Sequence, residues 1–116
     1  MIKEILLNTL EKLNYSIYQQ GTIALDAEYP DSFITFEIVD SQEKEIFDNK
    51  SNATEWTISV IFYSVDPLLV QSEGVNIYNT LKNAGFIPQG KGADILSDEP
   101  THTGWVNEYL YLERND

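Results

Sequence analysis

The only histidine of the chain, His102, lies close in sequence to three carboxylates, Asp94, Asp98 and Glu99. An imidazole beside carboxylates could bind a metal ion or act as a catalytic base. Zinc sites, however, usually combine closely spaced cysteine or histidine ligands, and this chain has no cysteine. No G-x-S-x-G motif marks a nucleophile either. The pattern favours a histidine that makes structural hydrogen bonds, with a metal site or a small hydrolase built on this loop as weaker alternatives.

The spacing of Gly85, Gly90 and Lys91 matches that of a phosphate-binding loop. Such a loop follows a strand, precedes a helix and continues with Ser or Thr, whose hydroxyl binds magnesium. Here a predicted helix comes first, and Gly92 follows the lysine. No pair of carboxylates stands out as a catalytic acid and base. We therefore expect no enzymatic activity, no cofactor and no bound metal.

Three aromatic residues, Trp105, Tyr109 and Tyr111, share one face of a strand predicted over residues 105–112. Aromatic side chains are enriched at protein interfaces, which makes this face a candidate contact surface. A helix packed over the same face would explain the aromatic residues equally well. The sequence leaves both interpretations open.

The elements that position these residues are organised around a predicted central strand over residues 56–63, in which apolar side chains alternate. A turn follows, in which Asp66 is placed to cap a helix and Pro67 suits its first position. Apolar residues at three- and four-residue spacings predict one helical stripe that packs on the sheet. Gly85 ends this helix, and Phe86 is expected to fold back onto it.

The first part of the chain adds one helix and two strands. The predicted ranges are residues 2–13 for the helix, and 15–20 and 33–39 for the strands. The order is helix, three strands, helix, strand. This order predicts a single α+β domain over residues 1–116, with two helices packed on a small mixed or antiparallel sheet.

Two stretches lack periodicity and are predicted to be loops. Residues 40–54 form a polar, mostly acidic connection that is longer than ordinary hairpin loops. Ile46 and Phe47 form an apolar pair within it, which either tucks beneath the loop or contacts a partner. Residues 86–104 contain three glycines at 90, 92 and 104 and two prolines at 88 and 100.

The charge of the chain is strongly negative, with 19 acidic and 7 basic residues and a formal net charge of −12. Such a surface repels nucleic acid, which disfavours a protein that grips DNA, although it also simply promotes solubility. The N-terminus lacks the features of a signal peptide, and no apolar run reaches the length of a membrane span. These features predict a soluble cytoplasmic protein that binds no membrane. An acidic inhibitor, such as an immunity protein that masks a basic enzyme, fits the same charge.

Six short segments together resemble one family of structural proteins. The resemblance runs roughly from residue 29 to residue 113, and the family is that of the tail-to-head joining or tail terminator proteins of long-tailed bacteriophages and prophages. The segments are Tyr29–Phe33, Phe47–Asn49, Phe62–Pro67, Gly85–Ile87, Gly90–Gly92 and Ser97–Gly104. The chain differs from the family pattern at Ala93, where an aromatic residue is commoner, and at Trp105, where a basic residue is usual.

This resemblance implies a structural virion subunit that forms a ring, expected to be a hexamer, on the head-proximal end of the tail tube. The ring would stop tube growth and dock to the neck or connector protein of the head. DNA would pass through its lumen without specific binding. The protein would be located in the host cytoplasm during assembly and at the tail–head junction of the virion afterwards.

We expect such a ring to assemble through edge strands and through the segments at residues 90–104 and 40–54. The side chains expected at the interface belong to these segments and to the aromatic face of the last strand. They are Ile46, Phe47, Lys91, Asp98, Glu99, His102, Trp105, Tyr109 and Tyr111.

Overall fold

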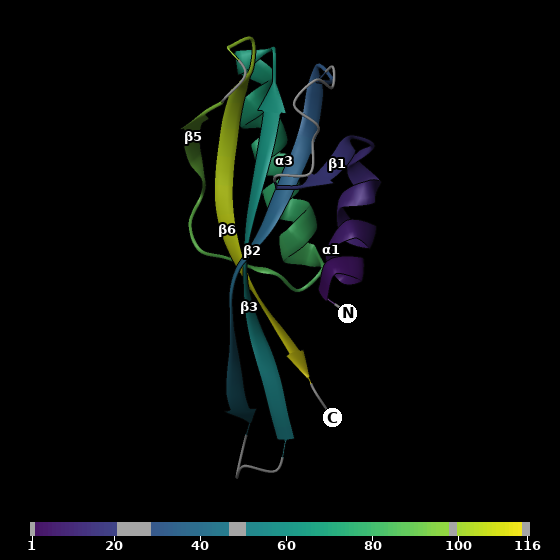
Figure 1. Ribbon diagram of the computed structural model, residues 1–116, viewed down its shortest axis with the longest axis vertical. Coiled ribbons are helices and arrows are strands. Elements are labelled where there is room, and N and C mark those ends of the chain that lie inside the picture. The colour runs from purple at the N-terminus through teal and green to yellow at the C-terminus, as the bar shows by residue number, and fades with distance from the viewer. Residues whose placement is uncertain (1, 21–28, 47–50, 98–99, 115–116) are drawn as a thin grey trace.

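The computed structural model describes residues 2–20, 29–46, 51–97 and 100–114 and has two α-helices on one face of a single β-sheet (Figure 1). The predicted α+β class and element order are confirmed, and two short strands that were not predicted precede the last one. In chain order the elements are α1 (Ile2–Leu10), the 3-10 helix η1 (Glu11–Leu13), β1 (Ser16–Gln19), β2 (Ser32–Ile46), β3 (Ser51–Ser64), α3 (Pro67–Asn83), β4 (Ile87–Pro88), β5 (Ala93–Leu96) and β6 (Thr103–Arg114).

The sheet is mixed and has the strand order β1-β2-β3-β6-β4, with β5 also paired to β6. The β1 strand runs parallel to β2, and the other pairs are antiparallel. The β3 strand lies between β2 and β6, which confirms it as the central strand. Its residue Phe62 is opposite Ile34 on one side and Trp105 on the other. Residues directly opposite one another share a face, so all three side chains point toward the helices.

The hydrophobic core lies between this face of the sheet and the two helices. The face of β3 predicted to point inward contains Trp56, Ile58, Val60 and Phe62. The last three are buried, and Trp56 is partly buried against the same core. Each large apolar side chain buried in this way stabilises the fold by about 1.5–3 kcal/mol. From α1 the core takes Ile2, Leu6 and Leu10, from α3 it takes Val70, Ile77 and Leu81, and from the rest of the chain it takes Ile34, Phe36, Phe86 and Tyr109.

Both ends of α3 have the predicted caps. The Asp66 side chain accepts a hydrogen bond of 3.0 Å from the backbone N–H of Leu68, and Pro67 is the first helical residue. At the other end, the backbone N–H of Phe86 donates to the carbonyl of Leu81 at 3.0 Å. Gly85 precedes it with φ at 99°, and Phe86 is buried against the core. This arrangement satisfies carbonyls that a helix C-terminus otherwise leaves unpaired.

The prediction of a loop over residues 40–54 is wrong. The β2 strand continues to Ile46, and β3 begins at Ser51, so the two form a long hairpin. Figure 1 shows this hairpin extending beyond the helices, and the molecule measures 52 × 28 × 23 Å. We call residues 40–46 and 51–57 the arm. Among the described residues, most of the arm extends past the helices (Figure 1). It buries Ala53 and part of Trp56 but few other apolar side chains, so the polar sequence that suggested a loop is compatible with a strand.

The prediction of a continuous loop over residues 86–104 is also wrong in two places. The β4 strand pairs with β6 at Leu110 and Tyr109, and β5 pairs with β6 from Val106 to Thr103. Both strands form because they pair with the long β6 strand, and neither has an alternating apolar pattern of its own. Strands of two and four residues are too short to produce a periodic pattern.

Candidate assembly interface

His102 is a structural residue beside a cluster of aromatic rings and is only 7% exposed. Its Nε2 lies 2.8 Å from the carbonyl oxygen of Pro30, and its Nδ1 lies 3.0 Å from the hydroxyl of Thr101. A carbonyl can only accept, so Nε2 donates its hydrogen to Pro30, and Nδ1 pairs with the hydroxyl of Thr101. Both ring nitrogens therefore have a hydrogen-bond partner. This geometry favours the structural role over the catalytic base.

The rings around His102 form a small second core on the sheet face opposite the helices. Phe33, on β2, lies at its centre and is 2% exposed. The Phe33 ring stacks on Tyr63 with centroids 5.1 Å apart and meets His102 edge to face at 5.6 Å. Tyr18 and Tyr29 contact it at 5.9 and 5.5 Å. The burial of His102 in this cluster leaves it little surface with which to contact a partner.

The carboxylates near His102 do not form a metal site in the part of the chain that the structure describes. Asp94 is exposed on β5, whereas Asp98 and Glu99 lie outside the described residues. Within those residues, no group of three or more His, Cys, Asp or Glu side chains could hold a metal ion. The expected interface role of Asp98 and Glu99 remains a prediction.

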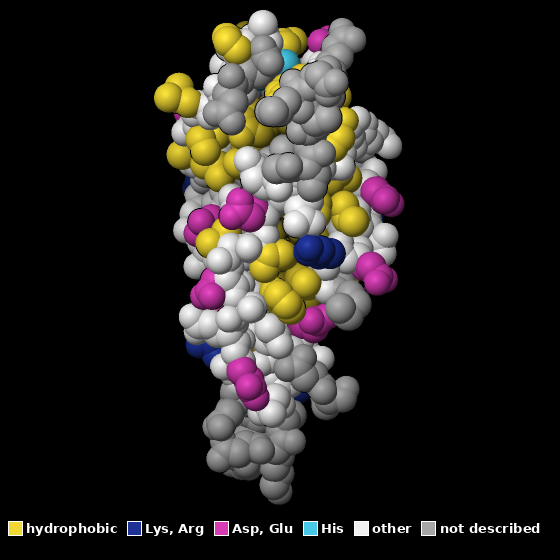
Figure 2. Space-filling view, viewed as in Figure 1, with side chains coloured by type: hydrophobic (Ala, Val, Ile, Leu, Met, Phe, Trp, Pro, Cys, Tyr) yellow, Lys and Arg dark blue, Asp and Glu magenta, His cyan; other side chains and the backbone are white. Residues whose placement is uncertain are grey.

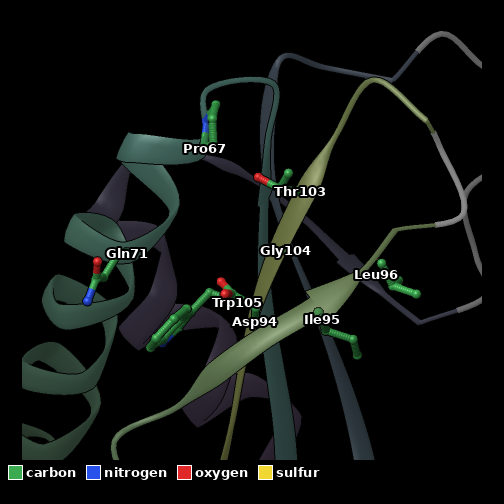
Figure 3. A pocket seen from close by; sticks show the side chains of 8 residues that line it. All are labelled: Pro67, Gln71, Asp94, Ile95, Leu96, Thr103, Gly104 and Trp105. Atoms are coloured by element: carbon green, nitrogen blue, oxygen red, sulfur yellow. The ribbon is translucent and has the colours of Figure 1, made fainter.

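The aromatic face of β6 is turned toward α3, as the covering-helix interpretation predicts. Trp105 points from β6 toward that helix (Figure 3). A Cβ added to Gly74 of α3 would lie 2.5 Å from Trp105 Cδ1, and one added to Gly92 would lie 2.2 Å from its Nε1. Two glycines therefore make room for one indole ring. Trp105 is half-buried, because its ring packs against Gly74 of α3 and Gly92 of the same chain.

Tyr109 and Tyr111 continue this inward face of β6. Tyr109 is 1% exposed, and its burial raises the pKa of the phenol to about 12. Tyr111 is half-buried, with its ring centroid 4.5 Å from that of Phe86. The expectation that these tyrosines are surface aromatics is wrong for Tyr109. It retains too little surface to contact a partner in this conformation.

Lys91 lies at the surface, beside the C-terminal half of α3. Its Nζ is 5.0 Å from the ring centroid of Tyr78, and the Nζ of Lys82 is 5.7 Å from the same centroid. After Lys91 the chain enters β5 and not a helix. The segment from Gly85 therefore lacks the helix that supports a phosphate-binding loop. Lys91 of this segment instead shares the ring of Tyr78 with Lys82 of α3.

Ile46 is the last residue of β2, and Phe47 lies outside the described residues. The side chain of Ile46 is not described either. Their expected contact with a partner stays a prediction.

A groove lies between the start of α3 and β5, with a volume of about 650 Å³. Figure 3 shows Pro67 and Gln71 on its helix side, while Leu96 projects from β5 away from that helix. Leu96 is 95% exposed, and Leu68 in the first turn of α3 is 84% exposed. Figure 2 shows hydrophobic side chains gathered at this end of the molecule. The groove thus adjoins a surface of the kind that marks protein contacts.

Sequence reasoning did not assign these apolar residues to the interface. A signal existed for Leu68, because it lies outside the helical stripe that begins at Val70 and includes Gly74 and Ile77. An apolar residue outside the stripe of an amphipathic helix faces solvent. No comparable signal existed for Leu96, since the segment around it has no periodicity.

The sheet has unpaired edges on two opposite sides. The β1 strand pairs with β2 only as far as Phe36, so residues 37–46 of β2 pair with β3 alone within the described part of the chain. On the other side, β5 pairs with β6 alone among the same residues. An unpaired edge presents backbone donors and acceptors to which another strand can pair.

Comparisons with known protein families and with curated protein sequences found no match. The described helices include none that is long and apolar enough to cross a membrane. The candidate interface therefore rests on this chain's own geometry. Its parts are the free edge of β5 with the adjoining groove, the lysine pair, and the free edge of β2 along the arm.

Proposed function

We propose that this chain is the subunit of a phage tail terminator ring, a structural protein that ends tube growth and joins tail to head. The observation that carries this proposal is the presence of unpaired edges on opposite sides of one sheet in the described residues. A subunit with different contact surfaces on its two sides associates head to tail. Such contacts form a ring when the rotation between neighbours closes.

The surface chemistry of the β5 side supports a role in assembly. Leu96, Ile95 and Leu68 expose apolar side chains beside a free strand edge and a groove. Large exposed apolar residues next to an unpaired edge favour association, and a monomer would normally protect such an edge. The resemblance of six segments to tail terminator proteins implies that this association forms a ring.

The net charge of −12 fits a ring through which DNA passes. A negative lumen repels phosphates and leaves the DNA free to move. In this proposal the partners are further copies of the chain, the tail tube protein, and the neck or connector protein of the head. The protein assembles in the host cytoplasm and ends at the tail–head junction of the virion.

The proposal is tested with purified protein and isolated tail tubes. Light scattering measures the mass of the protein in solution, and negative-stain imaging shows whether rings, expected to be hexameric, occupy one end of the tubes. Tubes polymerised with the protein should also be shorter than tubes polymerised without it. If the protein forms no ring, either alone or on tubes, and leaves tube length unchanged, the proposal is wrong.

An acidic inhibitor of a basic enzyme is the second candidate, and the net charge of −12 is the observation that favours it. Exposed tyrosines on β6 would also suit such an inhibitor, but Tyr109 is buried. Tight one-to-one binding to a basic nuclease, with loss of the nuclease activity and no ring formation, would establish the inhibitor instead.

A further inference from the structure

Two lysines converge on the edge of the molecule where β5 is unpaired. Lys82 on α3 and Lys91 just before β5 both lie over the ring of Tyr78 and are exposed. Only seven basic residues occur in the chain, so two on one ring form a local positive region in an acidic protein. The aromatic face attracts both ammonium groups and helps to hold them in place.

The arm carries the opposite charge along the other free edge. Residues 37–46 of β2 contain four carboxylates and one lysine. That lysine, Lys44, lies 4.0 Å from Glu55 on the neighbouring β3 strand, so its charge is already paired within the arm. Asp40 and Glu43 are exposed on the same strand. The free edge of the arm therefore presents negative charge next to unpaired backbone groups.

We propose that the β2 edge of one subunit's arm docks along the free β5 edge of the next subunit, with its carboxylates against Lys82 and Lys91. This inference rests on the proposed ring and specifies its subunit contact. Backbone hydrogen bonds between two free edges add one strand to the neighbouring sheet. The opposite charges select this pairing over contact between two arms, which would bring like charges together.

A second copy of this chain is the occupant that these surfaces fit. The acidic edge and the lysine-bearing edge lie on opposite sides of one sheet, so every copy supplies both. The contact is heterologous, and repeating it produces the head-to-tail arrangement that a ring requires. The arm extends past the helices, which leaves its edge accessible to a neighbour (Figure 1).

Disulfide trapping tests the contact directly, because the chain contains no cysteine. Cysteine is introduced at Ala93 together with one of three neighbouring arm positions, Ser41, Gln42 or Glu43, to cover the possible registers. On assembled rings, at least one pair should give a ladder of cross-linked oligomers under oxidising conditions, since a disulfide requires Cα atoms within about 7 Å. The matched control combines the same arm cysteine with Asn8→Cys on α1, and it should give no ladder.

Charge reversal provides a second, independent test. The variant Lys82→Glu/Lys91→Glu should assemble at least about tenfold more weakly, because like charges then face each other across the contact. Glu43 is opposite Thr54, on the same face of the sheet as Trp56 and the helices, whereas Asp40 is opposite Thr57 on the other face. Adding Glu43→Lys to the same chain should therefore restore assembly in part, and adding Asp40→Lys should not. The control Lys3→Glu/Lys12→Glu changes the net charge equally on α1 and the adjoining η1 and should assemble like the wild type. Circular dichroism confirms that each variant is folded.

The outcomes distinguish failure of the proposed arm–β5 contact from failure of the proposed ring. Rings that form normally in the Lys82→Glu/Lys91→Glu variant, or rings in which none of the three cysteine pairs cross-links, would overturn the contact and leave the terminator proposal standing. Absence of rings in the wild-type protein would instead overturn the terminator proposal. Weakening by the lysine reversals with partial rescue by Glu43→Lys supports the contact.

Discussion

The β3 strand passes through two regions that differ in every respect except their backbone pairing. Under the helices, Ile58 and Phe62 are almost fully buried. In the arm, the same strand runs through mostly polar residues, with Ala53 and Trp56 as its apolar members, and is paired on both sides by β2 and β6, up to Ala53 opposite Arg114. One region is held by apolar burial and the other by its hydrogen-bonded ladder. The arm can therefore carry contact residues with little effect on the stability of the domain.

The largest effect is expected from Phe62→Ala in the helix-covered region. The Phe62 ring is buried and meets Tyr15 edge to face with centroids 4.9 Å apart. Replacing such a residue by alanine should lower the free energy of unfolding by about 3–5 kcal/mol, as measured by urea denaturation. The matched control Gln42→Ala on the arm should change it by less than about 0.5 kcal/mol. Equal losses in the two variants would remove the distinction between the regions.

A smaller effect is expected where β5 joins the core through Trp105. Gly92 has φ at +100°, and a Cβ there would lie 2.2 Å from the indole nitrogen. Gly92→Ala should therefore destabilise the protein by about 1–3 kcal/mol in the same assay. Gly90→Ala in the same turn is the control, because its nearest neighbour would be 4.0 Å away. A neutral Gly92→Ala would show that Trp105 and the turn adapt freely.

The sequence predicted the helix-covered region well because burial leaves a periodic pattern there. The alternation in β3 identified the buried face, and Asp66 and Gly85 marked the ends of α3. The arm buries few large apolar side chains, with Ala53 buried and Trp56 partly buried, so its strands were mistaken for a loop. The pairing that makes residues 40–54 a hairpin joins β2 to β3, from Asp40 opposite Thr57 to Ile46 opposite Ser51, but the polar side chains of these strands give no apolar alternation that would mark them as strands.

The candidate interface was predictable only in part, because the fold brings together residues that are distant in sequence. Lys91 was expected at the interface and is exposed, and its interface role stays a prediction. Its partner in the lysine pair, Lys82, comes from a different element and is brought near by the fold. The aromatic residues of β6 were ambiguous because strand periodicity separates two faces without saying which one is covered. Tyr109 shows that the covered face was the aromatic one.

A pH-dependent effect should distinguish contacts in the helix-covered region from those in the arm. Burial and a hydrogen bond to Glu73 raise the pKa of Tyr15 from 10.0 to about 12. Burial raises the pKa of Tyr109 to about 12 as well. The unfolded chain loses these protons near pH 10 while the folded chain keeps them, so stability is retained below pH 10 and falls as pH rises toward 12.

The variants Tyr15→Phe and Tyr109→Phe should each flatten this alkaline fall in the free energy of unfolding, measured by urea denaturation at several pH values between 10 and 12. The arm variant Gln42→Ala should leave the slope unchanged. A slope that is the same in all three variants would show that neither phenol contributes to the pH dependence of folding.

The smallest effect on stability is expected from shortening the arm itself. Gln42 and Glu55 are directly opposite in the ladder, so an Asn-Gly turn between them can replace residues 43–54. The free energy of unfolding should change by less than about 1 kcal/mol, because the helix-covered core is intact. Assembly on tail tubes, imaged by negative stain, should be lost. A shortened protein that still forms rings would assign the arm a role outside the interface, and one that unfolds would make the arm part of the folding unit.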